Sequence, residues 1–550
     1  MLKEKSTAIA DKWFYILLFV GIAINIPALF TTILEPDGAL YASIAKTMAQ
    51  SNDFINLKVD NKDWLDKPHF PFWMAAFSYK IFGINSFAYK LPAFLFWLMG
   101  LLYTFRFAKI LYNQQTARIA VLIYITTAHL VISNNDVRAE PYLTGLIIAA
   151  VYHFYLASSK KYSWHLIAGA AMAACAIMTK GPFVLITIGA GFIIDWIIKK
   201  KWQEFAQPRW WLAIVLTGIF ILPEIACLFW QFDLHPEKTV FNQHRVSGIR
   251  FFFWDSQFGR FFNTGPIKGD GDYFFYFHTF LWAFLPWSLV AAIAFAWRFK
   301  NYKNDLINGE YINLGAVCIS FAIFSLSRFQ LPHYINILYP FVAIITAQFL
   351  LASAKSKRIN GLQKLQLVIG VLMIAVVFCL VILFQAGNVW LILLWTVFIA
   401  GLLFFLPAKE KLASLIKCTC LSAAFVYGML NMFFYPALLE YQSGSKAAFY
   451  ANRNYPNQKL VQLNTSSYSL AFYAKTNVEY YNADEVKKIK TPMLVYCTQE
   501  ELNSLDKKTF NIQLLQSFPH FHISQLSLPF INYKTRPATL ETFVLAKIAQ

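Results

Sequence analysis

The chain has 550 residues, of which 58% are hydrophobic, 18% aromatic and only 14% charged, and its mean hydropathy is +0.47. Soluble globular domains contain about 25% charged residues, so this composition excludes an ordinary soluble enzyme, a disordered chain and a fibrous repeat. The net charge of +19 favours basic cytoplasmic loops over a nucleic-acid partner, because Lys and Arg in such loops set membrane topology. We therefore expect a polytopic membrane protein that binds no nucleic acid.

Apolar segments recur along the chain at the length that a membrane-spanning helix needs, about 20 residues. The first, residues 13–34, follows a short basic N-terminus and is expected to be an uncleaved span. With the segments that follow it we expect about 13 transmembrane helices, an odd number that places the two termini on opposite sides of the membrane. The later segments lie near residues 87–112, 116–133, 141–158, 163–179, 182–198, 210–231, 275–297, 311–326, 331–353, 364–385, 388–407 and 413–436.

Basic and acidic residues alternate between the predicted loops. Lysines gather at residues 199–201 and 355–357, in every second loop, whereas acids gather in the loops between, for example at residues 35–37 and 270–272. Because basic loops are retained on the cytoplasmic side, we expect a cytoplasmic N-terminus in a bacterial inner membrane. The acids and the C-terminal region would then face the periplasm.

The composition changes from about residue 440. Short strands predicted at 461–463, 478–481, 493–497 and 512–515 alternate with helices predicted at 467–473, 484–490 and 500–506, a pattern typical of a small α/β domain. We expect a transmembrane domain over residues 1–438, with long outer loops at 35–86 and 233–274, and a periplasmic α/β domain over residues 439–550. Residues 70–84, in the first loop, are predicted to form an interfacial amphipathic helix.

The outer ends of the predicted spans carry charged residues that a membrane scaffold does not need. The acids Asp37, Asp66 and Glu140 have a simple alternative explanation as solvated helix ends or N-caps. Cations at the same face are harder to explain in this way, because the positive-inside rule places them on the other side. Together they favour a bound phosphate at headgroup depth, with the acids available for proton abstraction or metal binding. The outer cations are Lys67, Arg138, Lys180, Arg260 and Arg328.

These motifs carry a resemblance to a known family. Six of them occur in the family's order: Pro-Asp-Gly-Ala-Leu-Tyr at 36–41, Asp-Lys-Pro at 66–68, Arg-Ala-Glu at 138–140, Thr-Lys-Gly-Pro at 179–182, Gln-Phe-Gly-Arg-Phe at 257–261 and Leu-Pro-His-Tyr at 331–334. The chain resembles the polyprenyl-phosphate-sugar-dependent glycosyltransferases of the C-type membrane fold (GT-C), which include the lipid A aminoarabinose transferases and the protein O-mannosyltransferases. The resemblance implies a polytopic α-helical membrane protein of GT-C type with a small α/β periplasmic C-terminal domain.

The resemblance also implies an activity. An inverting hexosyl- or pentosyltransferase would move a monosaccharide from undecaprenyl phosphate to a lipid A, glycan or protein acceptor, and membrane lipids would surround it. Asp37, Glu140 and Asp66 would be the catalytic acids, with Asp37 as the base for a hydroxyl acceptor. The outer cations would bind the donor phosphate. Further candidates for substrate contact are Tyr41, Tyr334, Gln257 and Glu224.

Three residues depart from the family pattern. Gly38 and Asp66 stand where the family usually has Glu, and Gln257 stands where it has His. In the aminoarabinose branch the positions of Asp66 and Gln257 are associated with a bound zinc. Because Gln is a poor zinc ligand beside His, no cofactor is assigned, and a divalent cation at Asp66 is left open.

Two other functions are compatible with many helices and a polar outer mouth. A carrier-lipid or glycolipid transporter or flippase would place its polar residues near the bilayer midplane, in repeated halves, whereas here the charges gather at one face and no repeat is visible. A glycan polymerase or ligase would also bind a lipid phosphate but would use a longer donor. The monosaccharide transferase is the preferred hypothesis.

Overall fold

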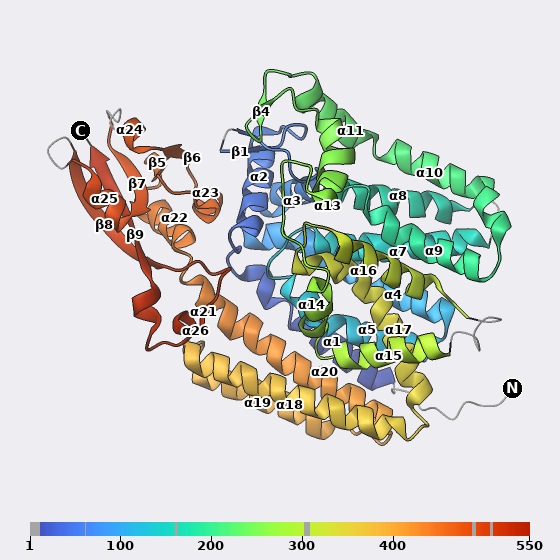
Figure 1. Cartoon of the computed structure of the whole chain (residues 1–550). Helices are drawn as coiled ribbons and strands as arrows, with labels where there is room; N and C mark the ends of the chain where they lie inside the picture. Colours follow the sequence, from blue (N-terminus) through green and yellow to red (C-terminus); the bar gives the residue numbers. More distant parts are fainter. Residues whose placement is uncertain are drawn as a thin grey trace.

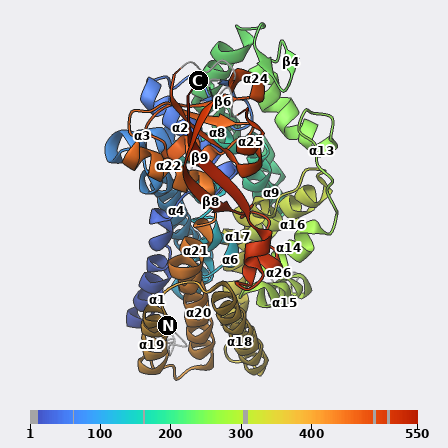
Figure 2. The same cartoon turned by 90° about the vertical axis from the view of Figure 1, so that its left-hand side faces the viewer.

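The computed structural model describes residues 11–60, 62–159, 163–301, 309–486, 491–506 and 510–549. Helices form a large bundle, and a small sheet domain packs at one end of it (Figures 1 and 2). Two short hairpins, β1 (Lys58–Val59) with β2 (Lys62–Asp63) and β3 (Thr239–Val240) with β4 (Gln243–His244), lie in loops of the bundle. The bundle helices are α1 (Asp11–Ala23), α2 (Asp37–Ser51), α3 (Phe70–Phe82), α4 (Ser86–Leu111), α5 (Gln114–Ile125), α6 (Ala128–Ile132), α7 (Glu140–Ser158), α8 (Trp164–Lys180), α9 (Val184–Ile198), α10 (Pro208–Phe220), α11 (Leu222–Leu228), α12 (Gly248–Arg250), α13 (Arg260–Phe262), α14 (Phe275–Ala283), α15 (Ser288–Lys300), α16 (Ile312–Leu326), α17 (Tyr339–Ser353), α18 (Arg358–Phe384), α19 (Val389–Phe405), α20 (Lys411–Met429) and α21 (Tyr435–Leu439).

The bundle has the helices of a multi-pass membrane protein. In the part of the chain that the structure describes, seven helical segments are long and apolar enough to cross a membrane, and the pair α14–α15, bent by 119°, would be an eighth. The four shorter apolar helices are α8, α9, α16 and α19. Each predicted span coincides with a helix or a consecutive set of helices, and the segment predicted near 116–133 is divided between α5 and α6.

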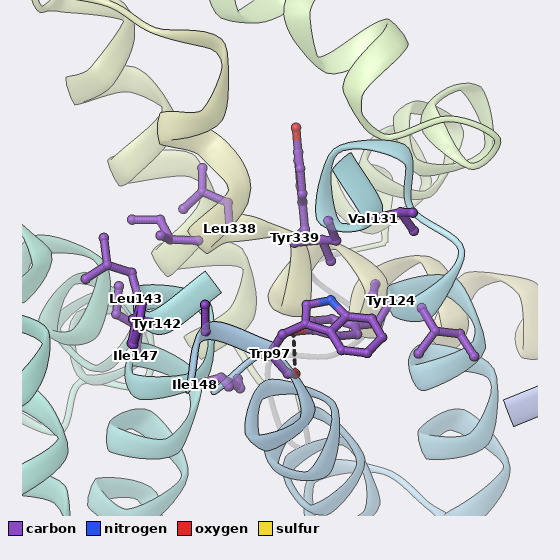
Figure 3. Close-up of a cluster of buried hydrophobic side chains, with 14 of the residues drawn as sticks. Trp97, Tyr124, Val131, Tyr142, Leu143, Ile147, Ile148, Leu338 and Tyr339 are labelled. Atoms are coloured by element: carbon purple, nitrogen blue, oxygen red, sulfur yellow. Dashed lines mark hydrogen bonds between the residues drawn. The ribbon is translucent and has the colours of Figure 1, made fainter. Parts of the chain in front are cut away.

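The core of the bundle is built from aromatic and aliphatic side chains of α4, α5, α7 and α17 (Figure 3). Trp97, Tyr124 and Tyr339 are completely buried there, and the Tyr124 hydroxyl donates to the Trp97 carbonyl at 2.9 Å. At Gly145 a Cβ would lie 2.1 Å from the Phe96 carbonyl oxygen, so α7 approaches α4 as closely as it does only because this residue has no side chain. Small residues at helix contacts allow such backbone approach in membranes.

The C-terminal domain is a five-stranded sheet with the order β6-β5-β7-β9-β8, flanked by short helices. β5 pairs in parallel with β6 and β7, and β9 runs antiparallel to both β7 and β8. The four predicted strands and the helices near 467–473 and 500–506 are present; of the helix predicted at 484–490, residues 487–490 lie outside the described residues. The elements are α22 (Ser443–Asn454), β5 (Leu460–Leu463), α23 (Tyr468–Tyr473), β6 (Val478–Tyr481), α24 (Ala483–Val486), β7 (Met493–Thr498), α25 (Gln499–Ser504), β8 (Asn511–His520), α26 (Leu528–Ile531) and β9 (Glu541–Ala549).

Several elements of the fold were not predicted from the sequence, among them α2, α22, β9 and the two short hairpins. The strand β9 inserts between β7 and β8, although its Leu-Ala-Lys stretch is made of good helix formers. The helix α2 begins at Asp37, in the part of the outer loop before residue 70 where no helix was predicted. A helix is present where one was predicted at 70–84, as α3.

Helix α2 and Glu35, which lies just before it, join the bundle to the C-terminal domain through both ends of α23. Glu35 Oε1 accepts from the backbone N–H of Ser469 at 2.6 Å and from the Ser467 hydroxyl at 2.8 Å, at the start of α23. Lys46 Nζ donates to the carbonyls of Ala471, Phe472 and Ala474 at the other end, at 2.7–3.0 Å. A carboxylate at the N-terminus and a cation at the C-terminus both complement the helix dipole. The C-terminal domain therefore holds the segment that carries Asp37.

The contact at Glu35 gives a testable pH dependence. Burial raises the pKa of Glu35, against the lowering effect of its bonds to Ser469 and Ser467, so the folded protein binds this proton more tightly than the unfolded chain does. Folding stability from this group is therefore lost as the pH rises above the ordinary pKa of a glutamate. Glu35→Gln keeps the acceptor oxygen but removes the charge, and we expect its thermal midpoint to exceed that of the wild type by an amount that grows between about pH 4 and pH 7.

Exposed Glu500 provides the control for this measurement. Glu500→Gln makes the same chemical change in the same domain, on α25, and should follow the wild-type midpoint at every pH. A difference between Glu35→Gln and wild type that stays constant with pH would contradict the assignment.

Candidate active site

A cavity of about 140 Å³ lies where the loops at the α2 end of the bundle converge. Four cations and three carboxylates line it, an unusual concentration for a chain with so few charged residues. They come from segments far apart in the sequence, so the fold assembles the site. The lining residues are Asp37, Tyr41, Asp66, Lys67, Arg138, Ala139, Glu140, Lys180, Arg260, Ile267, Phe329, Leu331, His333 and Tyr334.

Asp37 is held by Arg138 at the edge of the cavity. Arg138 Nη1 donates to Asp37 Oδ2 at 2.6 Å, and its Nε donates to Asp136 Oδ2 at 2.9 Å. Burial lowers the pKa of Arg138, but the two carboxylates outweigh it and the net shift is upward. Arg138 is therefore always charged and orients Asp37 at the first turn of α2.

Buried amide side chains fix the loop that carries Arg138. Asn134 Nδ2 donates to Asn25 Oδ1 at 2.9 Å, and Asn135 Nδ2 donates to Asn431 Oδ1 at 2.9 Å. Asn431 in turn donates to the Ile24 carbonyl at 2.7 Å. The loop before α7 is thereby tied to the first and last parts of the bundle.

Asp66 connects two of the cations. Its carboxylate pairs with Lys67 at 2.7 Å and with Arg260. Burial raises the pKa of Asp66, but Lys67 and Arg260 outweigh it and lower that pKa to about 2. Burial lowers the pKa of Lys67, against the raising effect of Asp66. Arg260 Nε is buried and has no hydrogen-bond partner among the described residues, so this donor is available to an anion in the cavity.

Glu140 and Lys180 form a second ion pair in the wall of the cavity. Lys180 Nζ donates to Glu140 Oε1 at 2.6 Å, and Glu140 is only 2% exposed. The same ammonium lies 3.5 Å from the centre of the Tyr334 ring, within the range of a cation–π contact. His333 Nε2 lies 3.7 Å from Glu140 Oε1.

A second cavity of about 90 Å³ adjoins the charged one and shares Lys180, Arg260, Phe329 and Tyr334 with it. The remainder of its wall is mostly apolar, so the shared cations lie between a charged cavity and an apolar one. Its apolar lining comes from Leu143, Phe183, Val184, Phe261, Ile323, Phe324 and Ile337.

Gln257 supports the turn that follows Lys180. Its Nε2 donates to the Lys180 carbonyl at 3.2 Å and to Ser256 Oγ at 2.8 Å. Gly181 has a φ of +107°, and a Cβ there would lie 2.1 Å from Gln257 Nε2. Both the left-handed backbone and the close approach require glycine at this position.

Gly181→Ala is therefore expected to lower the free energy of unfolding by about 1–3 kcal/mol, because it adds backbone strain and displaces Gln257. Thermal or denaturant unfolding of the purified protein measures the effect. Gly189→Ala on α9 is the matched control, since a Cβ at Gly189 meets nothing within 4 Å. Equal stabilities of the two variants would contradict the argument.

Ten of the twelve residues singled out from the sequence lie at these two cavities, and the other two do not. Glu224 is completely buried (0% exposed) and accepts from the backbone N–H of His69 at 3.0 Å. It also contacts His69 Nδ1 at 2.9 Å, while His69 Nε2 contacts the Ile55 carbonyl. Burial lowers the pKa of His69, but Glu224 outweighs it and raises that pKa. Glu224 therefore lies outside the two cavities, against the loop that carries Asp66 and Lys67, and its contact with substrate stays a prediction.

Arg328 is the second residue that the structure places elsewhere. It lies 5.9 Å over the Tyr273 ring, and its backbone N–H donates to the Phe261 carbonyl at 3.1 Å. It lines neither cavity, and its contact with the donor phosphate stays a prediction. His333, by contrast, lines the charged cavity and was not predicted as a site residue. Its place beside Tyr334 in the same motif is the signal that could have revealed it.

The residues present do not fit a zinc ion at Asp66. Its carboxylate is engaged by Lys67 and Arg260, and Gln257 points its amide at Lys180 and Ser256. Within the described ranges, no group of three or more His, Cys, Asp or Glu side chains could hold a metal ion. Three histidines of the outer loops, His69, His235 and His244, contact Glu224, Glu237 and Thr239, respectively.

Comparisons with known proteins found a matching family model and similar chains. A family model described as dolichyl-phosphate-mannose-protein mannosyltransferase matches residues 66–227. An undecaprenyl phosphate-alpha-4-amino-4-deoxy-L-arabinose arabinosyl transferase of Edwardsiella ictaluri is 26% identical over 370 residues, which cover 65% of this chain and 63% of that protein. The transferase of the same name from an Enterobacter species is 25% identical over 61% of this chain and 59% of its own length. The match thus spans about three-fifths of these relatives.

A solved structure is similar over almost the whole chain. The crystal structure of ArnT from Cupriavidus metallidurans bound to undecaprenyl phosphate has a TM-score of 0.74 and 15% identity, and covers 98% of both chains. Its apo form has a TM-score of 0.73 and covers 97% of this chain. At this identity the likeness establishes the fold. The chain is therefore a multi-pass membrane protein with the fold of ArnT, and its resemblance to the GT-C glycosyltransferases is confirmed.

Proposed function

We propose that this protein is an inverting glycosyltransferase that moves a monosaccharide from undecaprenyl phosphate to an acceptor at the periplasmic face of the bacterial inner membrane. The observation that carries the proposal is the pair of adjoining cavities with Lys180 and Arg260 between them. An apolar chamber suits the start of a polyprenyl tail, a charged chamber suits a sugar, and the shared cations suit the phosphate that joins them. Relatives that are named as undecaprenyl-phosphate-linked sugar transferases support it.

The chemistry follows from the charges of the cavity. An acceptor oxygen attacks the anomeric carbon, and the bond from that carbon to the phosphate oxygen breaks with its electron pair going to the leaving undecaprenyl phosphate. Negative charge grows on the phosphate, where Lys67, Lys180 and Arg260 stabilise it. A single displacement inverts the anomeric centre. No step requires a metal ion.

The role of Asp37 depends on the acceptor. A sugar, Ser or Thr hydroxyl must lose its proton, and Asp37 would take it as a general base. A phosphate of a lipid A type acceptor is already anionic, so Asp37 would then only orient it and balance charge. Lipid A is the preferred acceptor class because the relatives are arabinosyl transferases; glycan and protein acceptors are the alternatives.

The proposed topology places the charged cavity and the C-terminal domain in the periplasm. Basic residues gather in the loops at the far ends of the helices, for example at residues 199–201, where the positive-inside rule expects the cytoplasm. The donor cavity would then lie at the depth of the outer-leaflet headgroups, where a lipid-linked sugar presents its phosphate.

A transfer assay tests the function. Purified protein receives a panel of radiolabelled undecaprenyl-phosphate sugars, with lipid A, glycan and protein fractions of a cell envelope as acceptors. We expect label to move from one donor into one fraction, with inversion at the anomeric carbon. Tight donor binding without transfer to any fraction would contradict the transferase and favour a carrier-lipid transporter.

A further inference from the structure

A cleft of about 550 Å³ opens between α18 and α20, far from the proposed donor site. Its residues belong to the first three turns of each helix, 360–367 and 411–419. The opposite end of α18 meets the C-terminal domain, where Arg536 Nη2 donates to the Phe384 carbonyl at 3.0 Å. Figure 1 shows the α18–α20 group extending away from that domain. The cleft therefore lies at the other membrane face from the charged cavity.

The cleft is basic. Lys364 and Lys411 line it, and Lys411 Nζ donates to Asn360 Oδ1 at 2.7 Å on the facing helix. The adjoining loops add further cations at residues 355, 357, 358 and 409 against one acid, Glu410. Basic pockets between transmembrane helices at this face are where anionic lipid headgroups bind.

The polar group that most needs a ligand is Gln366. Its side chain lines the cleft and is only 2% exposed, and neither its Nε2 nor its Oε1 has a hydrogen-bond partner among the described residues. A buried amide without partners costs about 1–3 kcal/mol, so native proteins rarely leave one unsatisfied. A ligand that both accepts and donates hydrogen bonds would satisfy both atoms of the Gln366 amide.

The same cleft continues into an apolar surface. Leu367 and Leu415 line it, and Val368 and Val371, on the following turn of α18, are more than half exposed. Side chains three and four residues apart share one face of a helix. An acyl chain whose headgroup lies at Lys364 would therefore run along Leu367 and Val371.

We propose that this cleft is a binding site for an anionic phospholipid with a hydroxylated headgroup, of the phosphatidylglycerol type. Lys364 and Lys411 bind the phosphate. Gln366 Nε2 donates to a phosphate or ester oxygen, and Gln366 Oε1 accepts from a headgroup hydroxyl. The acyl chain packs on α18. The site is independent of the donor cavity and of the transferase function.

Lipid titration of the delipidated full-length protein tests the proposal, with the thermal midpoint and native mass spectrometry as readouts. Phosphatidylglycerol should stabilise the wild type more than phosphatidylcholine does, because a ligand that binds only the folded state raises its stability. In Lys364→Gln/Lys411→Gln the apparent affinity for phosphatidylglycerol should fall about twenty-five-fold, at roughly a five-fold loss for each lysine. Gln366→Leu should weaken binding about five-fold through the lost hydrogen bonds.

The matched control is Lys355→Gln/Lys409→Gln, which removes the same charge from exposed positions outside the cleft and should lose far less affinity than Lys364→Gln/Lys411→Gln. Equal loss in the control would mean that only the general positive field attracts lipid, and would overturn the site. Equal stabilisation by phosphatidylcholine, or by inorganic phosphate alone, would overturn the lipid specificity. Donor transfer is not part of the readout, so a failure here leaves the transferase proposal untouched.

Discussion

Replacing Asp37 by Asn should lower the rate of sugar transfer to a hydroxyl acceptor by about 10²- to 10⁴-fold and leave the protein folded. The amide keeps the shape of the side chain and one acceptor oxygen for Arg138, but it cannot take a proton. The rate is measured with the radiolabelled donor, and folding is checked by the thermal midpoint. With an anionic phosphate acceptor the loss should be far smaller, so the same variant separates the two acceptor classes.

Asp136→Asn is the control for this experiment. Asp136 accepts from the same Arg138 at 2.9 Å but does not line the cavity. A change of rate that is equal in the two variants would mean that both act through the position of Arg138, and would contradict a role for Asp37 as base. A wild-type rate in Asp37→Asn with a hydroxyl acceptor would do so as well.

Replacing Lys180 by Met should affect both stability and transfer. It leaves Glu140 as a buried carboxylate without its partner at 2.6 Å, and breaking such a pair from one side costs about 3–5 kcal/mol of folding free energy. It also removes a cation from the proposed phosphate position, for which we expect a loss of about 10²- to 10³-fold in transfer. Unfolding in mixed micelles and the transfer assay measure the two effects separately.

A double variant separates structure from function at this pair. Lys180→Met with Glu140→Gln removes the stranded charge, so stability should largely return while transfer stays low. Lys199→Met is the matched control, because Lys199 pairs with Asp195 at 2.7 Å at the opposite end of the neighbouring helix and lies outside the cavity. Recovery of transfer in the double variant would show that Lys180 acts only by neutralising Glu140.

Much of the fold could be predicted because hydropathy is a local property. Spans such as α4 and α18 are helices of 26 and 27 residues in which apolar residues predominate, and no distant contact is needed to recognise them. Strand β6 was predicted at its observed bounds from its aromatic and β-branched residues. Strand β9 was missed because its place depends on β7 and β8, which precede it in the chain.

The site was predictable in its residue types but not in its pairings. The sequence by itself determined that acids and cations gather at one face, because charge and hydropathy alternate along the chain. Only the tertiary structure decided that Arg138 holds Asp37, that Lys180 holds Glu140, and that His333 joins them. The contacts of Glu224 with His69 and of Arg328 with the Tyr273 ring are likewise visible only in the tertiary structure. Ion pairs and cavities form between segments that are remote in sequence, and their geometry depends on how the helices pack.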